Sequence, residues 1–292
     1  MNIPTAHRHA MSQFSGRRLA AMMYAMGSDS ADISRMPRGG PDASFLDRLL
    51  QTGLSEYSDR DDADPNLRKA AIEGQEQVDK IMQHHQPMVK LILEAVADKP
   101  DPAILELGAG TGLMSRMLLE QHPSMRLTVS DVDPARVSEL IESLLGKHSR
   151  VTISHLDATR IDAPDGAFDL AVFAYGLHHL SAVQAAQMLV EGTRVASELL
   201  VVDVSRPPSP VHLVRLATLA PFAPVVPFVH DAMISSLRAY SASAIRAIAA
   251  DAGDRCGEPI AVSVAKVGPD LLVRARRATP PEPTDTTTVP EA

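Results

Sequence analysis

The stretch that decides the fold is AILELGAGTG, residues 103–112. It begins with an apolar run typical of a buried strand, and helical periodicity follows it from Leu113 to Leu119. Glycines allow a tight turn and a close approach of the backbone to a ligand, and the next helix offers unpaired N–H groups. Strand, glycine turn and helix together predict the start of an α/β nucleotide site. A glycine-rich turn without a ligand is the alternative.

The spacing of the glycines indicates which nucleotide. A dinucleotide fingerprint is G-x-G-x-x-G, and here Leu113 stands at its third glycine. The pattern is instead E-x-G-x-G-x-G, with Glu106 as the acid. This resembles motif I of the class I S-adenosylmethionine (SAM) methyltransferases. The resemblance implies SAM as cofactor, with Gly108, Gly110 and Gly112 along its methionine and ribose portion and Glu106 at its amino-acid end.

Three further strand ends fit the same arrangement. The strand expected at residues 126–132 carries Asp131, placed where an acid accepts hydrogen bonds from ribose hydroxyls. Asp133 and Pro134 then begin a helix, as N-cap and first residue. After the strand expected at 151–156, the resemblance assigns adenine binding to Asp157. The cofactor residues that we assign are Tyr57, Glu106, Gly108, Ala109, Gly110, Gly112, Asp131, Val132, Asp157, Ala158 and Ala174.

Strands expected at 168–173 and 199–204, and a closing pair at 259–266 and 270–276, complete the sheet. The last helix is expected at 241–252, closed by Gly253. We therefore predict an α/β fold, a doubly wound seven-stranded sheet that is mostly parallel. An N-terminal helical lid and a helical cap after strand five would be added to it.

Two histidines follow strand four, in AYGLHHL, residues 174–180. Ligands of open α/β sheets bind beyond the carboxyl ends of the strands, so this segment is expected beside the methyl group. His178 and His179 are candidate general bases, and a satisfied structural histidine is the alternative for each.

The segment at residues 206–240 is apolar but interrupted by prolines, which suits a substrate cap and no membrane span. The cap predicts a hydrophobic or aromatic substrate; a helical pair packed on the sheet is the alternative. It ends in His230 and Asp231, a candidate base and its orienting acid. Asp231 would equally serve as N-cap of a helix from Ala232.

Four segments are expected along the chain: a flexible arm at 1–43, a helical lid segment at 44–102, the SAM-binding domain at 103–278 and a disordered tail at 279–292. Residues 55–64 are acidic and are expected to form a solvated loop. The resemblance makes Tyr57 in this loop the candidate aromatic lid over the cofactor, and an exposed loop tyrosine is the alternative.

Composition limits the other function classes. The 292 residues carry a formal charge of −8, which disfavours a nucleic-acid partner. Cys256 is the single cysteine, so no disulfide within the chain and no cysteine zinc site can form, and we assign no metal ligand. We expect a cytoplasmic monomer or homodimer with a small-molecule substrate.

The sequence thus predicts a SAM-dependent methyltransferase of small molecules, with O-methylation favoured over N- or C-methylation. S-adenosylhomocysteine (SAH) would be the coproduct. Two alternatives stay open: a SAM-binding protein without methyl transfer, and a dinucleotide-dependent oxidoreductase, against which Leu113 argues.

Overall fold

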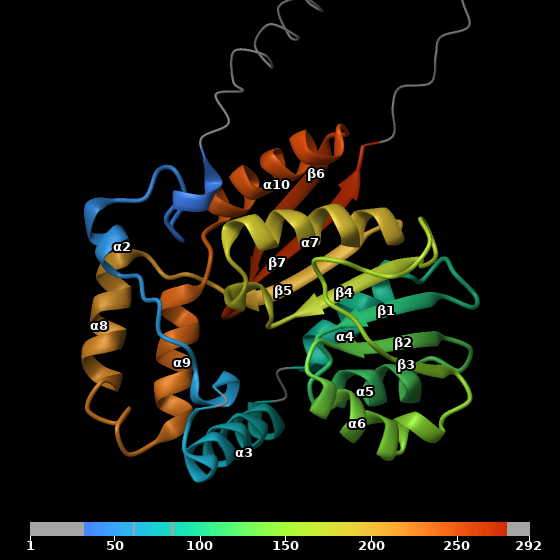
Figure 1. Cartoon of the computed structure of the whole chain (residues 1–292), viewed down its shortest axis with the longest axis horizontal. Coiled ribbons are helices and arrows are strands. Elements are labelled where there is room, and N and C mark those ends of the chain that lie inside the picture. Colours follow the sequence, from blue (N-terminus) through green and yellow to red (C-terminus); the bar gives the residue numbers. More distant parts are fainter. Residues whose placement is uncertain (1–31, 61, 83–84, 279–292) are drawn as a thin grey trace, which may run out of the picture.

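The computed structural model describes residues 32–60, 62–82 and 85–278. Its seven strands form one sheet in the order β3-β2-β1-β4-β5-β7-β6 (Figure 1). The strands are β1 (Ala103–Leu107), β2 (Arg126–Asp131), β3 (Val151–His155), β4 (Leu170–Ala174), β5 (Leu199–Val204), β6 (Ile260–Val267) and β7 (Asp270–Arg277). The first five are parallel, and β7 and β6 close the sheet as antiparallel neighbours. The predicted seven-stranded, mostly parallel sheet is confirmed.

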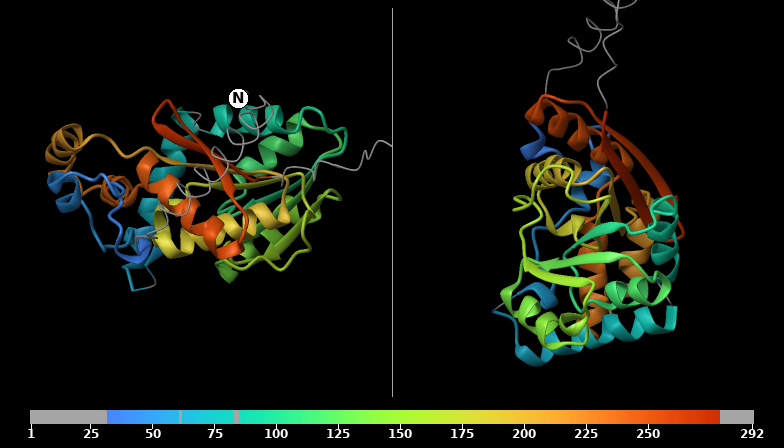
Figure 2. Two further views of the ribbon diagram at one scale, coloured as in Figure 1. Left: turned by 90° about the horizontal axis from the view of Figure 1, so that it is seen from above. Right: turned by 90° about the vertical axis from the view of Figure 1, so that its right-hand side faces the viewer.

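Helices cover both faces of the sheet (Figure 2). Leu105 and Leu107 of β1 belong to a core shared with α7 (Ala182–Val195) and α10 (Ala242–Cys256). Ile104 belongs to the opposite core, with α4 (His85–Ala95), α5 (Leu113–Gln121) and α6 (Pro134–Glu142). Successive strand residues point to opposite faces, so one short apolar run supplies both cores.

Local sequence signals set most helix ends. Asp133 caps α6 by accepting a hydrogen bond from the N–H of Ala135, with Pro134 at the first position, as predicted. Gly253 is a correction, because it lies buried within α10 and does not end the helix. The helix ends instead at Gly257, whose φ of 74° is the left-handed conformation that glycine adopts without strain.

The cap and the lid lie at one end of the sheet (Figure 1). They consist of α2 (Phe45–Leu49), α3 (Pro65–Met82), α8 (Ser209–Leu219), α9 (Pro227–Arg238) and the 3-10 helix η2 (Tyr57–Asp59). Three further 3-10 helices are η1 (Ile33–Arg35), η3 (Leu145–Lys147) and η4 (Leu177–His179). Helix α3 contacts α9, so the lid segment and the cap form one layer.

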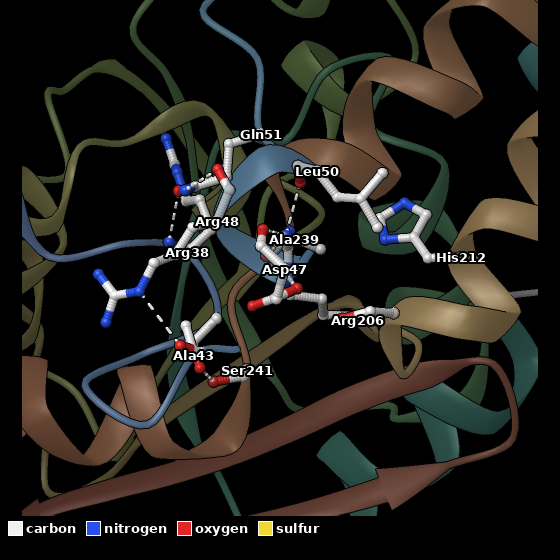
Figure 3. Close-up of polar contacts among 12 residues, drawn as sticks. Arg38, Ala43, Asp47, Arg48, Leu50, Gln51, Arg206, His212, Ala239 and Ser241 are labelled. Carbon is white, nitrogen blue, oxygen red and sulfur yellow. Dashed lines mark hydrogen bonds and ion pairs between the residues drawn. The ribbon is translucent and has the colours of Figure 1, made fainter. Parts of the chain in front are cut away.

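Arg206, directly after β5, joins the lid segment to the cap (Figure 3). Its side chain is 2% exposed, and its Nε donates to Oδ1 of Asp47 at 2.9 Å. Nη2 donates to the carbonyl of Leu50 at 2.6 Å, and Nη1 to those of Leu237 and Ala239 at 2.8 and 3.1 Å. One buried guanidinium therefore holds α2 to the end of α9.

The expected N-terminal arm is packed where the structure describes it, at residues 32–43. Ile33 is 5% exposed in the core that contains α7 and α10, and Arg38 stacks over the ring of Tyr240 at 4.2 Å. Residues 1–31 and the expected tail at 279–292 lie outside the described residues. Within the described ranges, no helix is both long and apolar enough to span a membrane.

Candidate active site

A cavity of about 410 Å³ opens at the carboxyl ends of β1, β4 and β5, beneath α3 and α9. This is the edge where open α/β sheets bind their ligands. Its floor includes Glu106, Gly108, Ala109 and Ala174, and its roof includes Phe228 of α9. The cavity thus lies between the predicted cofactor turn and the predicted cap.

The glycine turn has the left-handed backbone that glycine permits, with φ of 64° at Gly108 and 53° at Gly110. A Cβ added at Gly110 would meet no atom within 4 Å, so the turn is open on that side. At Gly112 an added Cβ would collide with the side chains of Leu145 and Leu140, so this glycine serves packing. The open turn at Gly110 leaves room for a cofactor close to the backbone.

Asp131 fixes this turn from the end of β2. Its Oδ2 accepts from the N–H of Gly110 and its Oδ1 from that of Asp133, both at 2.9 Å. Val132 beside it is 60% exposed, and Asp157 is exposed and accepts from the N–H and hydroxyl of Thr159. These residues lie outside the wall of the cavity, along the ends of β2 and β3, where the ribose and adenine of a nucleoside are expected.

Glu106 is 2% exposed on the cavity floor, and the hydroxyl of Ser115 in α5 donates to its Oε2. Burial raises the pKa of Glu106 to about 7, although the bond from Ser115 opposes that rise. A cationic group bound beside it would favour the ionised carboxylate. This position therefore suits the ammonium or sulfonium of SAM.

His178 is buried between two carboxylates. Its Nδ1 donates to Oδ1 of Asp203 at 2.6 Å, and its Nε2 lies 3.3 Å from Oε1 of Glu56. Burial alone would lower its pKa, but the charges and hydrogen bonds of Asp203 and Glu56 raise that pKa to about 10. An imidazole held protonated in this way is poorly prepared to accept a proton at neutral pH.

His179 is more accessible, with 31% of its side chain exposed, and it also lines the cavity. Its Nδ1 lies 2.8 Å from Oδ2 of Asp59. Arg238 donates to the backbone carbonyls of both histidines, at 3.2 and 2.9 Å. The arginine of the cap therefore holds η4 in place beneath α9.

Glu56 is a site residue that the sequence analysis missed, because residues 55–64 were expected to form a solvated loop. It is 7% exposed, lines the cavity, and accepts a hydrogen bond from Ser235 of α9 at 2.7 Å. Asp203 was missed as well, because the strand expected at residues 199–204 was given no site residue. No local pattern marks either residue, since their partners are far away in the sequence.

His230 and Asp231 do face each other, with Nδ1 of His230 2.9 Å from Oδ1 of Asp231. Asp231 is not an N-cap, because α9 already begins at Pro227. It accepts instead from the N–H groups of Tyr57 and Ser58, at 2.8 and 3.1 Å. The ring of Tyr57 stacks on that of His230 at 4.1 Å. Asp231 lines the cavity whereas His230 and Tyr57 do not, so this group holds the lid to the cap.

Comparison with known proteins agrees with this geometry. Residues 104–198 match the family model described as "Methyltransferase domain". A demethylmenaquinone methyltransferase of Beutenbergia cavernae is 31% identical over 119 residues, 40% of this chain and 46% of the relative. An uncharacterized methyltransferase of Anoxybacillus flavithermus is 35% identical over 91 residues, 31% of this chain and 40% of the relative. The matches thus span less than half the length of these curated relatives.

Among solved structures, the plantazolicin methyltransferase BpumL, in complex with a monoazolic desmethylPZN analog and SAH, has a similar fold. The TM-score is 0.55 at 10% identity, over 74% of this chain and 91% of that one. The match places a methyltransferase domain at residues 104–198, and the fold is of the class I methyltransferase type. SAM as the cofactor, which the glycine turn predicts, agrees with this match.

Proposed function

We propose that this protein transfers a methyl group from SAM to a hydroxyl oxygen of a small hydrophobic or aromatic molecule. The observation that carries the proposal is the single cavity in which the glycine turn, the histidines of η4 and an apolar roof meet. When bound, SAM supplies an electrophilic methyl group. The acceptor oxygen takes that methyl, its proton leaves, and SAH is the coproduct.

The cofactor would be held by the residues around β1, β2 and β3. Gly110 leaves room for it, and Gly108 and Glu106 line the part of the cavity that its cationic end would enter. Asp131 would accept from the ribose hydroxyls and Asp157 from the adenine amine. Orienting the acceptor and the methyl group in line would supply roughly 7–11 kcal/mol of the barrier reduction.

The acceptor would lie under α3 and α9. Ala71, Ile72 and Val78 of α3 and Phe228 of α9 line this part of the cavity, so an apolar or aromatic body is favoured over a polar one. Arg215 of α8 also lines it, and a guanidinium there suits an acceptor that carries an acidic group. The name of the Beutenbergia relative, a demethylmenaquinone methyltransferase, is consistent with a cyclic, apolar acceptor.

The acceptor hydroxyl would be activated at η4. Of the three histidine candidates, His179 has the geometry that best supports a base, since it lines the cavity and Asp59 orients its ring. His178 and the pair of His230 and Asp231 remain candidates. A positioned base contributes about 100-fold to 10,000-fold to the rate.

The test is a search for an acceptor, by untargeted metabolite profiling of a deletion strain and by SAH release from SAM with purified protein. His179→Ala should lower turnover at least about 100-fold while SAM affinity stays unchanged. Phe228→Ala should instead raise the KM for the acceptor. SAM binding without SAH formation from any acceptor would support the SAM-binding alternative, and tight binding of NAD would support the oxidoreductase.

A further inference from the structure

The side chains around η4 form a three-residue group that goes beyond the single base of the proposed reaction. Glu56, His178 and His179 each offer a ligand atom, and these atoms lie within 4.8 Å of one another. Two histidines and one carboxylate are a common donor set for first-row divalent metals. The group lines the cavity, so an ion held there would face the acceptor.

The spacing of the first two ligands suits one ion. Nε2 of His178 and Oε1 of Glu56 are 3.3 Å apart. With metal–ligand bonds of about 2.0–2.2 Å, two ligands of one tetrahedral ion lie roughly 3.3–3.6 Å apart. His179 would have to turn slightly inward, which its partly exposed ring on η4 allows.

Both histidines have the support that metal-binding histidines usually have. Such a histidine donates its other ring N–H to a carboxylate, which fixes the tautomer and aims the remaining nitrogen at the ion. Asp203 occupies this place at Nδ1 of His178, at 2.6 Å, and Asp59 at Nδ1 of His179, at 2.8 Å. The same arrangement on two neighbouring histidines leaves Nε2 of each as the available donor.

The charge of the group also favours a cation. Three carboxylates, those of Glu56, Asp59 and Asp203, contact the two imidazoles. The guanidinium of Arg238 donates to backbone carbonyls, those of both histidines and of Leu54. A divalent ion bound at Nε2 of His178 would take the place of the proton there, and it would balance the charge of the three carboxylates.

We propose that Glu56, His178 and His179 bind one divalent transition-metal ion of the zinc, cobalt, manganese or iron(II) type, with Asp203 and Asp59 as positioning residues. The inference rests in part on the proposed function, because it assigns the activation of the acceptor hydroxyl to this ion, with His179 as a metal ligand in place of a base. An oxygen bound to the ion would lose its proton to solvent more readily than a free hydroxyl.

The test uses full-length protein, freed of metal by a chelator and then titrated with Co²⁺, whose visible absorption reports its ligands. One equivalent should bind, with bands that indicate nitrogen and oxygen ligands. Asp59→Asn should weaken Co²⁺ binding by roughly 10–100-fold, and Asp59→Glu should restore part of it. Glu56→Gln and His179→Ala remove ligands and should weaken binding further.

His148→Ala is the matched control, because His148 lies before the amino end of β3, at the opposite edge of the sheet. Circular dichroism and SAM calorimetry on every variant show whether the fold and the cofactor site persist. If the folded protein binds no Co²⁺, or if Glu56→Gln and His179→Ala bind it as tightly as the parent, the group is an ion-pair network and the metal site is refuted. If the parent protein does not bind SAM, the proposed function is refuted instead.

Discussion

Asp131 is the side chain that would join the fold to the proposed cofactor. Both of its oxygens accept backbone N–H groups, one from the glycine turn and one from the turn before α6. Each carboxylate oxygen has further acceptor capacity, so ribose hydroxyls can bind without breaking these bonds. The sequence predicted this position because a strand end and a helix N-cap are local patterns.

The first prediction concerns this carboxylate. Asp131→Ala should weaken SAM binding by about 1–3 kcal/mol, because the ribose hydroxyls lose an acceptor and the N–H of Gly110 loses its hydrogen-bond partner. Calorimetry with SAM measures the change. Asp101→Ala, an exposed acid before the amino end of β1, is the control. Equal affinity in parent and Asp131→Ala would remove this residue from the cofactor site.

His212 in α8 is a buried histidine without a charged partner. It is fully buried, its Nε2 lies 3.1 Å from the hydroxyl of Ser236, and its Nδ1 has no hydrogen-bond partner among the described residues. Burial, and then the charges of Arg206 and Arg215, lower its pKa to about 4. The folded protein therefore holds this ring neutral.

The second prediction follows from that lowered pKa. Between pH 6.5 and 4, His212 is protonated in the unfolded chain but stays neutral in the folded protein. The free energy of unfolding is therefore unaffected by this group above pH 6.5 and falls as the pH drops below 6.5. This group alone should cost about 2 kcal/mol of the free energy of unfolding between pH 7 and pH 5. In urea unfolding, the loss of free energy between pH 7 and pH 5 should be smaller by this amount in His212→Gln than in the parent. An equal loss in both proteins would contradict the lowered pKa of His212.

At the scale of elements, the sheet and the helices of the lid were predictable, and the buried contacts of the loop around Glu56 were not. The strand Leu199–Val204 is an apolar run interrupted only by Asp203, and such a run is a local signal that needs no distant partner. By contrast, Glu56 and Asp59 look like part of an acidic surface loop. Only the folding of α9 over this loop brings Glu56 to His178, so no local pattern identifies it.

The third prediction concerns the joint between lid and cap. Arg206→Met should lower the free energy of unfolding by about 3–5 kcal/mol, because Asp47 is left buried without its partner and several carbonyls lose a donor. Lys90→Ala is the matched control, since Lys90 forms an exposed pair with Glu94 within α4 and should cost at most about 0.5 kcal/mol. Equal losses in chemical denaturation would show that Arg206 does not hold the two elements.

At the scale of the molecule, the boundary of the domain differs from the sequence-based division. Composition placed residues 32–43 in a flexible arm, because arginines, prolines and glycines dominate there. The structure packs this segment on α7 and α10, with Ile33 in the core. Two large apolar residues, Ile33 and Met36, in a polar stretch carry too weak a periodic signal to be noticed.

The fourth prediction compares two truncations. A chain that starts at residue 44 should melt roughly 4–20 °C lower than one that starts at residue 32, because losing a buried side chain such as Ile33 costs about 2–5 kcal/mol. Differential scanning calorimetry of the two chains measures this. Identical melting temperatures would show that residues 32–43 add no stability. The sequence-based expectation that residues 279–292 can be deleted without loss stays a prediction.

The joint between lid and cap has a consequence for how such a protein diversifies. The stretch that matches the family model carries the glycine turn, whereas Glu56, Arg215 and Phe228 of the cavity lie before or after it. Arg206 and Asp231 tie these two flanks together by buried polar bonds. A chimera that receives one flank from another protein would leave those bonds mismatched. Selectivity for a new acceptor would therefore be inherited only when both flanks are exchanged as a pair.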